Sequence, residues 1–271
     1  MSGDRPLVSV VVPTRDSART VARCLASLRA QTWPALELLV VDNWSRDGTW
    51  EVAAGLADVA LRAGPERSAQ RNLGIERAAG EWVLWVDADM VLASDAVERS
   101  LAAARAAGAG AVFLPEASTG SGFWARCRAL ERRCYDGEPS IESPRLVRAD
   151  HLRRAGGFAD DVTGLEDAAL RNRLLADGVR LARADTVVVH DEGRLGLAAV
   201  VRKRFYYGRS LPGYRRAYPG ATAAQVRGTL LAYWRHRRLL AADPVHAAGL
   251  AVLRGCEGGA WIAGAAVARR G

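Results

Sequence analysis

Two carboxylates that follow an apolar run are the residues best suited to chemistry. Asp87 and Asp89 come after the buried-strand pattern of residues 82–86 and are separated by Ala88 alone. Residues separated by one position on a strand share a face, so both carboxylates can point at one ion. Carboxylates suit Mg²⁺ or Mn²⁺, and a site with so few protein ligands takes the others from phosphate oxygens and water. The pair therefore predicts a metal-chelated diphosphate, with ordinary turn chemistry as the alternative.

Strands and helices alternate around this pair and must position it. Residues 7–12 and 36–41 are apolar runs typical of buried parallel strands, and a helical pattern follows each. We expect Asp16 or Ser17 to cap the first of these helices. The β-α-β alternation predicts a Rossmann-like half that binds a nucleotide beyond the carboxyl ends of its strands. Further strands are expected over residues 58–61, 111–114 and 143–148, and further helices over residues 47–56, 95–107 and 123–135.

Composition limits the class of protein. The chain has 271 residues, of which 49% are hydrophobic and 25% charged, and its length fits one large α/β domain with appendages. A net charge of +8 suits anionic partners such as nucleotide diphosphates, lipid phosphates or a membrane surface. Charge alone would also suit nucleic acid, but no other feature supports that partner, and we expect no nucleic-acid binding.

The cysteines and the hydropathy pattern exclude other classes. The four cysteines form no Cys-x-x-Cys pair, so we expect them to be reduced and structural. The sequence has neither a basic start followed by an apolar core nor an apolar run of about 20 residues. We therefore expect a cytoplasmic protein, which could also contact the inner face of the membrane.

Motifs around the two aspartates occur in the order typical of one family. Residues 68–75 are Ser-Ala-Gln-Arg-Asn-Leu-Gly-Ile, residues 78–81 are Ala-Ala-Gly-Glu, and Asp87-Ala88-Asp89 follows. These segments resemble the family 2 nucleotide-sugar glycosyltransferases, and the resemblance extends over residues 7–190. It implies a GT-A fold, which is an α/β fold with a Rossmann-like, mostly parallel sheet flanked by helices. We expect this domain over residues 1–222 and a C-terminal helical appendage over residues 223–271.

The resemblance assigns the donor site to loops at the strand ends. In the family, the loop after the first strand wraps the base and ribose, and an acidic side chain after the second strand hydrogen-bonds the base. Residues 42–49, Asp-Asn-Trp-Ser-Arg-Asp-Gly-Thr, resemble the second loop, although Asn43 stands where the family has aspartate. Turn formation is the alternative role for Asp42. The residues expected to bind the nucleotide sugar are Pro13, Thr14, Arg15, Asp42, Arg71, Asp87, Ala88, Arg204 and Arg209.

Catalytic and metal-binding roles also follow from the resemblance. Residues 156–158, Gly-Gly-Phe, precede Glu166-Asp167 as in the family, where the aspartate is the general base of inverting members. We assign this role to Asp167 and keep Glu166 as a second candidate; stabilisation of a helix N-terminus is the alternative for both. Mn²⁺ or Mg²⁺ is expected on Asp89, on Asp87 directly or through water, and on His190, which could instead be structural.

The sequence leaves alternative roles for two segments: donor binding, membrane contact or packing. Residues 202–209 are basic and aromatic and could form a mobile lid in which Arg204 and Arg209 offset leaving-group charge, or a surface for membrane or nucleic acid. In the appendage, residues 233–238 suit a headgroup layer. A membrane-surface contact, a homodimer contact and packing against the catalytic domain are the alternatives there.

These expectations together predict an inverting, metal-dependent transferase. A UDP-sugar is favoured as the donor, and the acceptor hydroxyl could belong to a lipid phosphate, a polysaccharide or a small natural product. One alternative is a catalytically silent module that binds a nucleotide sugar or a membrane. A nucleotidyltransferase is another, but the loop after residues 7–12 lacks the Gly-rich phosphate-binding pattern that such an enzyme needs.

Overall fold

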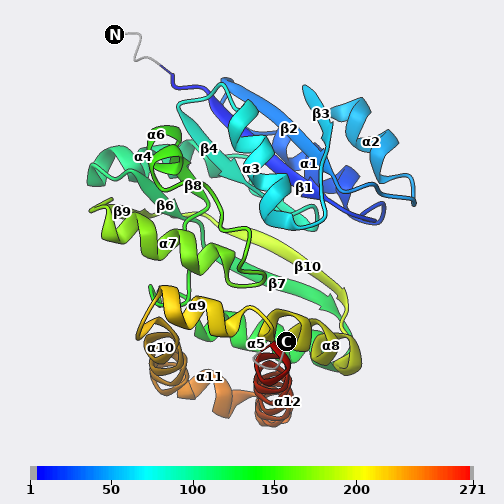
Figure 1. Ribbon diagram of the computed structural model, residues 1–271, viewed down its shortest axis with the longest axis vertical. Coiled ribbons are helices and arrows are strands. Elements are labelled where there is room, and N and C mark those ends of the chain that lie inside the picture. Colours follow the sequence, from blue (N-terminus) through cyan, green and yellow to red (C-terminus); the bar gives the residue numbers. More distant parts are fainter. Residues whose placement is uncertain (1–4, 269–271) are drawn as a thin grey trace. The chain divides into compact units, whose positions relative to one another are not determined.

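The computed structural model describes residues 5–268, which group into two compact units (Figure 1). Of the described residues, the first unit comprises 5–115, Ser143–Asp160 and Leu170–Val189. The second unit comprises Glu116–Glu142, Asp161–Ala169 and residues 190–268. Residues 190–222 group here with the C-terminal helices, and the proposed domain boundary after residue 222 stays a prediction.

A seven-stranded sheet forms the centre of the first unit. Its order is β3-β2-β1-β4-β8-β6-β9, and β8 is the strand that runs antiparallel to both of its neighbours. All seven residues of β1 are buried, as its run of valines predicts for a central strand. The expected mostly parallel α/β sheet is thus confirmed. The strands are β1 (Val8–Thr14), β2 (Leu36–Asp42), β3 (Val59–Arg62), β4 (Trp82–Trp85), β6 (Ala111–Phe113), β8 (Leu146–Arg148) and β9 (Leu181–Arg183).

Helices cover both faces of this sheet. Successive strand residues point to opposite faces, so a continuous apolar run makes both faces apolar. Val8, Val10 and Val12 pack in one core with α1 (Val21–Arg29), α2 (Thr49–Leu56) and α4 (Ala96–Ala107). Val11 and Trp85 belong to the opposite core, with α3 (Arg67–Arg77) and α6 (Ala149–Arg154). Leu170 and Leu174 of α7 (Glu166–Ala176) join that second core.

The first helix begins later than its sequence predicts. α1 starts at Val21, and neither Asp16 nor Ser17 caps it. Instead, Asp16 Oδ1 accepts from Arg46 N–H at 2.9 Å, and the Ser17 hydroxyl donates to the Arg15 carbonyl at 3.0 Å. The capping prediction was wrong because these side-chain oxygens bond other backbone groups and not the N–H groups at the start of α1.

The second unit is mainly helical. β7 (Glu116–Ser121) pairs with β10 (Val188–Arg194), and α12 packs against α8 and α5. Among the described residues, no helix is both long enough and apolar enough to cross a membrane. The helices of this unit are α5 (Phe123–Cys134), α8 (Leu197–Gly208), α9 (Leu211–Ala217), α10 (Ala221–Arg235), α11 (Arg237–Ala242) and α12 (Pro244–Ala268).

Candidate active site

The loops after β1 and β2 are joined through Asp42. Thr14 Oγ1 donates to Asp42 Oδ1 at 2.9 Å, and Ser45 donates through its N–H to Oδ2 at 2.9 Å and through its hydroxyl to Oδ1 at 2.5 Å. Asp42 has no exposed surface, Pro13 and Thr14 are buried, and Arg15 is exposed. These contacts give Asp42 a structural function in the loop, and base recognition by Asp42 stays a prediction.

An exposed tryptophan stands in the same loop and was not identified from the sequence. Trp44 is 62% exposed and has a φ of 52°, a left-handed conformation that is rare for a bulky residue and often marks a functional site. The Arg62 guanidinium lies 5.1 Å from the Trp44 ring and 4.2 Å from the Trp50 ring. Arg62 therefore supports Trp44, whose ring is available for stacking. Its signal in the sequence was an aromatic residue inside the Asp-Asn-Trp-Ser turn.

Three arginines surround the first aspartate of the Asp-x-Asp pair. Arg71 Nη2 bonds Asp87 Oδ1 at 2.8 Å, Arg67 Nη1 lies 3.9 Å from the same oxygen, and Arg145 Nη2 lies 3.8 Å from Oδ2. Arg71 is fully buried, whereas the Asp87 side chain is 19% exposed. Three guanidinium groups thus lie around one carboxylate, and guanidinium groups are suited to binding phosphates. Arg71 was expected here; Arg67 and Arg145 were not.

An aromatic pair supports the Arg71 guanidinium. Its carbon lies 4.9 Å from the centre of the Phe158 ring, which meets Trp85 edge-on at 5.0 Å. Asn72 fixes Phe158 by donating to its carbonyl at 2.9 Å and accepting from its N–H at 2.7 Å. The Gly-Gly-Phe segment therefore positions Arg71 against Asp87. Gly157 is required for this turn, since its φ is 67° and a Cβ would collide with Asn72.

The two aspartates lie in a turn and not on the strand. β4 ends at Trp85, and Met90 N–H closes the turn on the Asp87 carbonyl at 2.9 Å before β5 (Met90–Leu92) begins. The strand-alternation argument for a shared face therefore does not apply. Both side chains still stand close to Cys24, whose thiol donates to the Asp87 carbonyl at 3.6 Å. Burial, and then the charges of Asp89 and Asp87, raise the pKa of Cys24 to about 12.

This arrangement fits a metal held by few protein ligands. The described residues contain no group of three or more His, Cys, Asp or Glu side chains placed to hold a metal ion. Arg71 bonds Asp87, and metal binding by Asp87 and Asp89 stays a prediction. A diphosphate and water would supply the remaining ligands of a hard cation. Ala88, between Asp87 and Asp89, is buried.

The remaining predicted residues belong to the second unit. Glu166 and Asp167 form the first turn of α7, where Glu166 is 4% exposed and Asp167 is partly exposed. The loop before them is anchored within this unit, since Thr163 N–H donates to Ser210 Oγ at 3.0 Å and Gly164 packs tightly against the Tyr207 ring. On β10, His190 Nδ1 lies 3.9 Å from Glu192 Oε1.

Arg204 lies on a helix and pairs with a buried carboxylate. Residues 202–208 continue α8, and Arg204 Nε bonds Glu257 Oε1 of α12 at 2.9 Å. Glu257 is 2% exposed and also pairs with Arg128 and Arg254. This ion pair gives Arg204 a structural function, and its role in donor binding stays a prediction. Arg209 is exposed at the C-terminal end of α8, and its role stays a prediction.

Acid should destabilise the second unit through Glu257. Burial alone would raise the pKa of this carboxyl, but the charges of Arg204, Arg128 and Arg254 outweigh burial and hold the pKa at about 2. A lowered pKa stabilises the fold above the ordinary value of 4.5, so the unfolding free energy should fall as the pH drops from there toward about 2.

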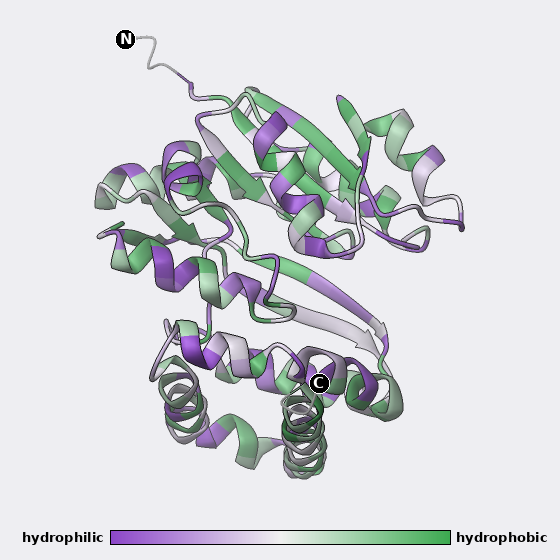
Figure 2. Ribbon diagram, in the orientation of Figure 1, coloured by the Kyte–Doolittle hydropathy of each residue, from purple (hydrophilic) through white to green (hydrophobic). Residues whose placement is uncertain are grey.

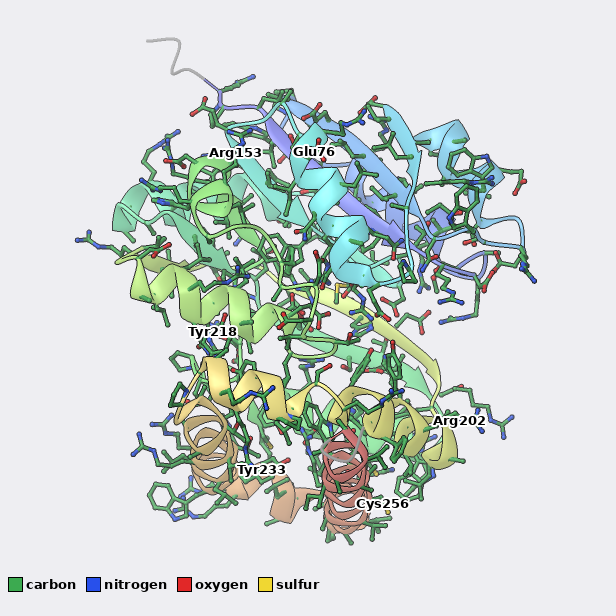
Figure 3. The ribbon with its side chains drawn as sticks, viewed as in Figure 1. Glu76, Arg153, Arg202, Tyr218, Tyr233 and Cys256 are labelled. Atoms are coloured by element: carbon green, nitrogen blue, oxygen red, sulfur yellow. The ribbon has the colours of Figure 1, made fainter. Side chains whose placement is uncertain are left out.

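Urea unfolding followed by tryptophan fluorescence across this pH range measures the effect. Glu257→Gln should lower the unfolding free energy at neutral pH by about 3–5 kcal/mol, because it removes a buried carboxylate that neutralises Arg128, Arg204 and Arg254, and should flatten the acid dependence. The control is Glu76→Gln on α3, an exposed residue labelled in Figure 3, which should change neither quantity. An unchanged acid profile in Glu257→Gln would contradict the assignment.

Comparison with known proteins now identifies the family. The sequence profile described as "Glycosyl transferase family 2" matches residues 9–148. Succinoglycan biosynthesis protein ExoA of Rhizobium meliloti is 25% identical over 255 residues, which cover 82% of this chain and 77% of ExoA. Glycosyltransferase AglE of Haloferax volcanii is 35% identical over 98 residues, which cover 33% of this chain and 32% of AglE. The match thus spans about a third of that relative's length.

Solved structures give the same fold. A mannosyltransferase, PcManGT from Pyrobaculum calidifontis in complex with GDP-Man and Mn²⁺, has a TM-score of 0.70 at 23% identity, covering 98% of this chain and 88% of that one. Residues 1–349 of S. aureus TarS, in complex with UDP-GlcNAc, have a TM-score of 0.54 at 17% identity, covering 75% and 66%. Because the profile spans more than half of the sequence, the chain belongs to glycosyl transferase family 2, and its fold is the GT-A fold of these glycosyltransferases.

Proposed function

We propose that the protein transfers a sugar from a nucleoside diphosphate to an acceptor hydroxyl, with inversion at the anomeric carbon and with a divalent metal. The observation that carries the proposal is the Asp87 cluster, in which Arg67, Arg71 and Arg145 surround one carboxylate beside Asp89. These cations suit the two phosphates of a donor and the charge that develops on the departing diphosphate. A UDP-sugar is the first donor to test, and GDP-mannose is the second because PcManGT binds it.

The chain's own residues would divide the reaction between them. Asp167 would take the proton from the acceptor hydroxyl while the oxygen of that hydroxyl attacks the anomeric carbon of the donor sugar. The bond from that carbon to the diphosphate oxygen breaks in the same step, and the electron pair leaves with the nucleoside diphosphate. Arg71 and Arg145 would stabilise the departing charge. Mn²⁺ or Mg²⁺ on Asp89, when bound, supplies further neutralisation of the phosphates.

Thermal unfolding with nucleotides tests the donor site first. UDP, GDP, dTDP and CDP are each added with and without Mn²⁺. A ligand present at 100 times its dissociation constant adds about 2.7 kcal/mol to the unfolding free energy. One nucleotide should stabilise the protein, and only when the metal is present. If none does, the metal-diphosphate site is wrong and a silent binding module becomes the better explanation.

Trp44 should act as the stacking surface for the nucleobase. Removing the ring in Trp44→Ala should weaken nucleotide binding by about 1–3 kcal/mol, because base-aromatic stacking contributes that much. Isothermal titration with the nucleotide that passes the thermal test measures the change. Trp234→Ala is the matched control, since Trp234 is 65% exposed on α10 of the second unit and should leave nucleotide affinity unchanged. Equal affinities for Trp44→Ala and the parent protein would remove Trp44 from the site.

A further inference from the structure

The outward face of α12 has the polarity of a buried surface. Every exposed described residue of this 25-residue helix is valine, isoleucine, alanine, proline or glycine. The largest are Val245, Val252, Ile262 and Val267, which are 64%, 53%, 71% and 52% exposed. Surface helices ordinarily present charged residues to water and apolar residues to the core. A contiguous apolar face of this kind marks an interaction site.

The rotation of α12 is fixed by contacts on its inner side. Glu257 is buried and accepts from Arg254 at 2.9 Å, and Arg254 also bonds buried Glu131 of α5. Tyr233 of α10, labelled in Figure 3, donates to the same Glu131 carboxylate at 2.5 Å. The charged residues of α12 are thus held inside the second unit. Gly264 also packs on this inner side, because a Cβ there would collide with the Phe205 carbonyl. Turning the apolar face inward would break all of these contacts.

A second apolar stripe lies on α10. Val226, Leu230 and Trp234 recur every four residues and are 56%, 63% and 65% exposed, so they share one face of the helix. Figure 1 shows α10 and α12 both nearly end-on and joined through α11, and Figure 2 shows mostly hydrophobic colouring on the visible turns of α12. We call these two stripes together the α10–α12 surface.

The charge around this surface is mainly positive. Within residues 221–268, the exposed charged residues are all arginines; Asp243 is partly exposed and hydrogen-bonds His246, and Glu257 is buried and pairs with arginines. The Arg237 guanidinium lies 5.0 Å from the Trp234 ring. Apolar side chains rimmed by tryptophan and arginine suit the boundary between acyl chains and anionic headgroups. The arginines are Arg227, Arg237 and Arg238, together with Arg235, which pairs with Glu138 at 2.9 Å.

Charge also favours a membrane over a second copy of the chain as the partner of this surface. In a two-fold symmetric dimer the same patch lies on both subunits, so this contact would bring one arginine-rich rim near another. Like charges brought together across an interface oppose association. Anionic lipid headgroups would instead neutralise the arginines.

We propose that the α10–α12 surface docks peripherally onto an anionic lipid membrane. The valines, Ile262 and Leu230 enter the outer part of the acyl layer, Trp234 lies at the headgroup level, and the arginines contact lipid phosphates. The inference is independent of the donor site, because α10 and α12 contain none of the residues assigned to sugar transfer.

Vesicle flotation of the full chain tests the proposal. One vesicle population contains phosphatidylcholine alone and the other phosphatidylcholine with phosphatidylglycerol. We expect the protein to float with the second population, to bind the first weakly, and to lose binding as salt is raised, because salt screens headgroup attraction. Failure to float with the phosphatidylglycerol vesicles at low salt would overturn the proposal.

Variants distinguish vesicle binding through the α10–α12 surface from nonspecific vesicle binding. Val252→Asp with Ile262→Asp should weaken partitioning about tenfold or more by placing charge in the acyl layer, and Arg237→Glu with Arg238→Glu should remove the preference for phosphatidylglycerol. Leu175→Asp on α7, a 51% exposed apolar position, is the matched control and should still float. Circular dichroism and nucleotide binding verify that each variant is folded. Vesicle binding that survives the aspartates, or a dimer by light scattering that they dissociate, would overturn the proposal.

Discussion

Asp167→Asn should lower kcat for sugar transfer by about 10²–10⁴-fold, the range typical for loss of a general base. Asparagine has nearly the same shape but cannot accept the acceptor's proton, so nucleotide affinity should not change. Asp167 is partly exposed in the first turn of α7, which leaves its carboxylate accessible to an acceptor. Steady-state release of the nucleoside diphosphate, together with titration of the nucleotide, measures the two effects.

A neighbouring carboxylate supplies the control. Asp161 is exposed in the loop before α7, and Asp161→Asn removes a similar charge without touching the proposed base. Its kcat should equal that of the parent protein. Normal turnover by Asp167→Asn would transfer the role to Glu166, and Glu166→Gln would then have to show the loss. Nuclear magnetic resonance of the product tests inversion, since a retained anomeric configuration excludes single displacement.

Asp89→Ala should abolish the metal dependence of nucleotide binding and lower kcat/KM by about 10³-fold, because a bound metal contributes several kcal/mol to stabilising transition-state charge. Asp89 is the expected principal ligand, since Asp87 is already held at 2.8 Å by Arg71. The first readout does not depend on turnover: the thermal stabilisation by nucleotide with Mn²⁺ should disappear.

The matched control for Asp89 is Asp185→Ala in the same unit, where the side chain is fully exposed and its distance to Arg99 is 3.4 Å. It should keep both the metal-dependent stabilisation and the activity. If Asp89→Ala still shows stabilisation that requires Mn²⁺, the metal lies elsewhere. Should activity be lost while that stabilisation persists, Asp89 acts on the reacting sugar and not on the metal.

Local patterns in the sequence were sufficient for much of the fold. Runs such as residues 7–12 predicted buried strands because parallel strands covered on both faces need continuous apolar side chains. A short strand was also predicted over residues 58–61, and β3 is found there at the edge of the sheet. Capping was harder: Asp16 and Ser17 have the right side chains, but their side-chain oxygens bond the backbone of Arg46 and Arg15 instead.

The strand order explains why Arg145 could not be found from the sequence. Arg145 precedes β8, and β8 lies beside β4 because it inserts antiparallel between β4 and β6. That insertion brings Arg145 to Asp87 across 58 positions of sequence. Arg67 had a local signal, one helical turn before Arg71 on α3, although the family motif drew attention to Arg71 alone.

The sequence by itself determined the family, the alternation of strands and helices, and the residue types available for chemistry, because these follow from local hydrophobic patterns and short motifs. Tertiary structure decided the contacts that these side chains make: Asp42 is buried between two loops, Phe158 supports Arg71, and Arg204 pairs with Glu257. It also decided the rotation of α12. The physical reason is that burial and ion pairing depend on which segments meet, and distant segments meet only when the whole chain folds.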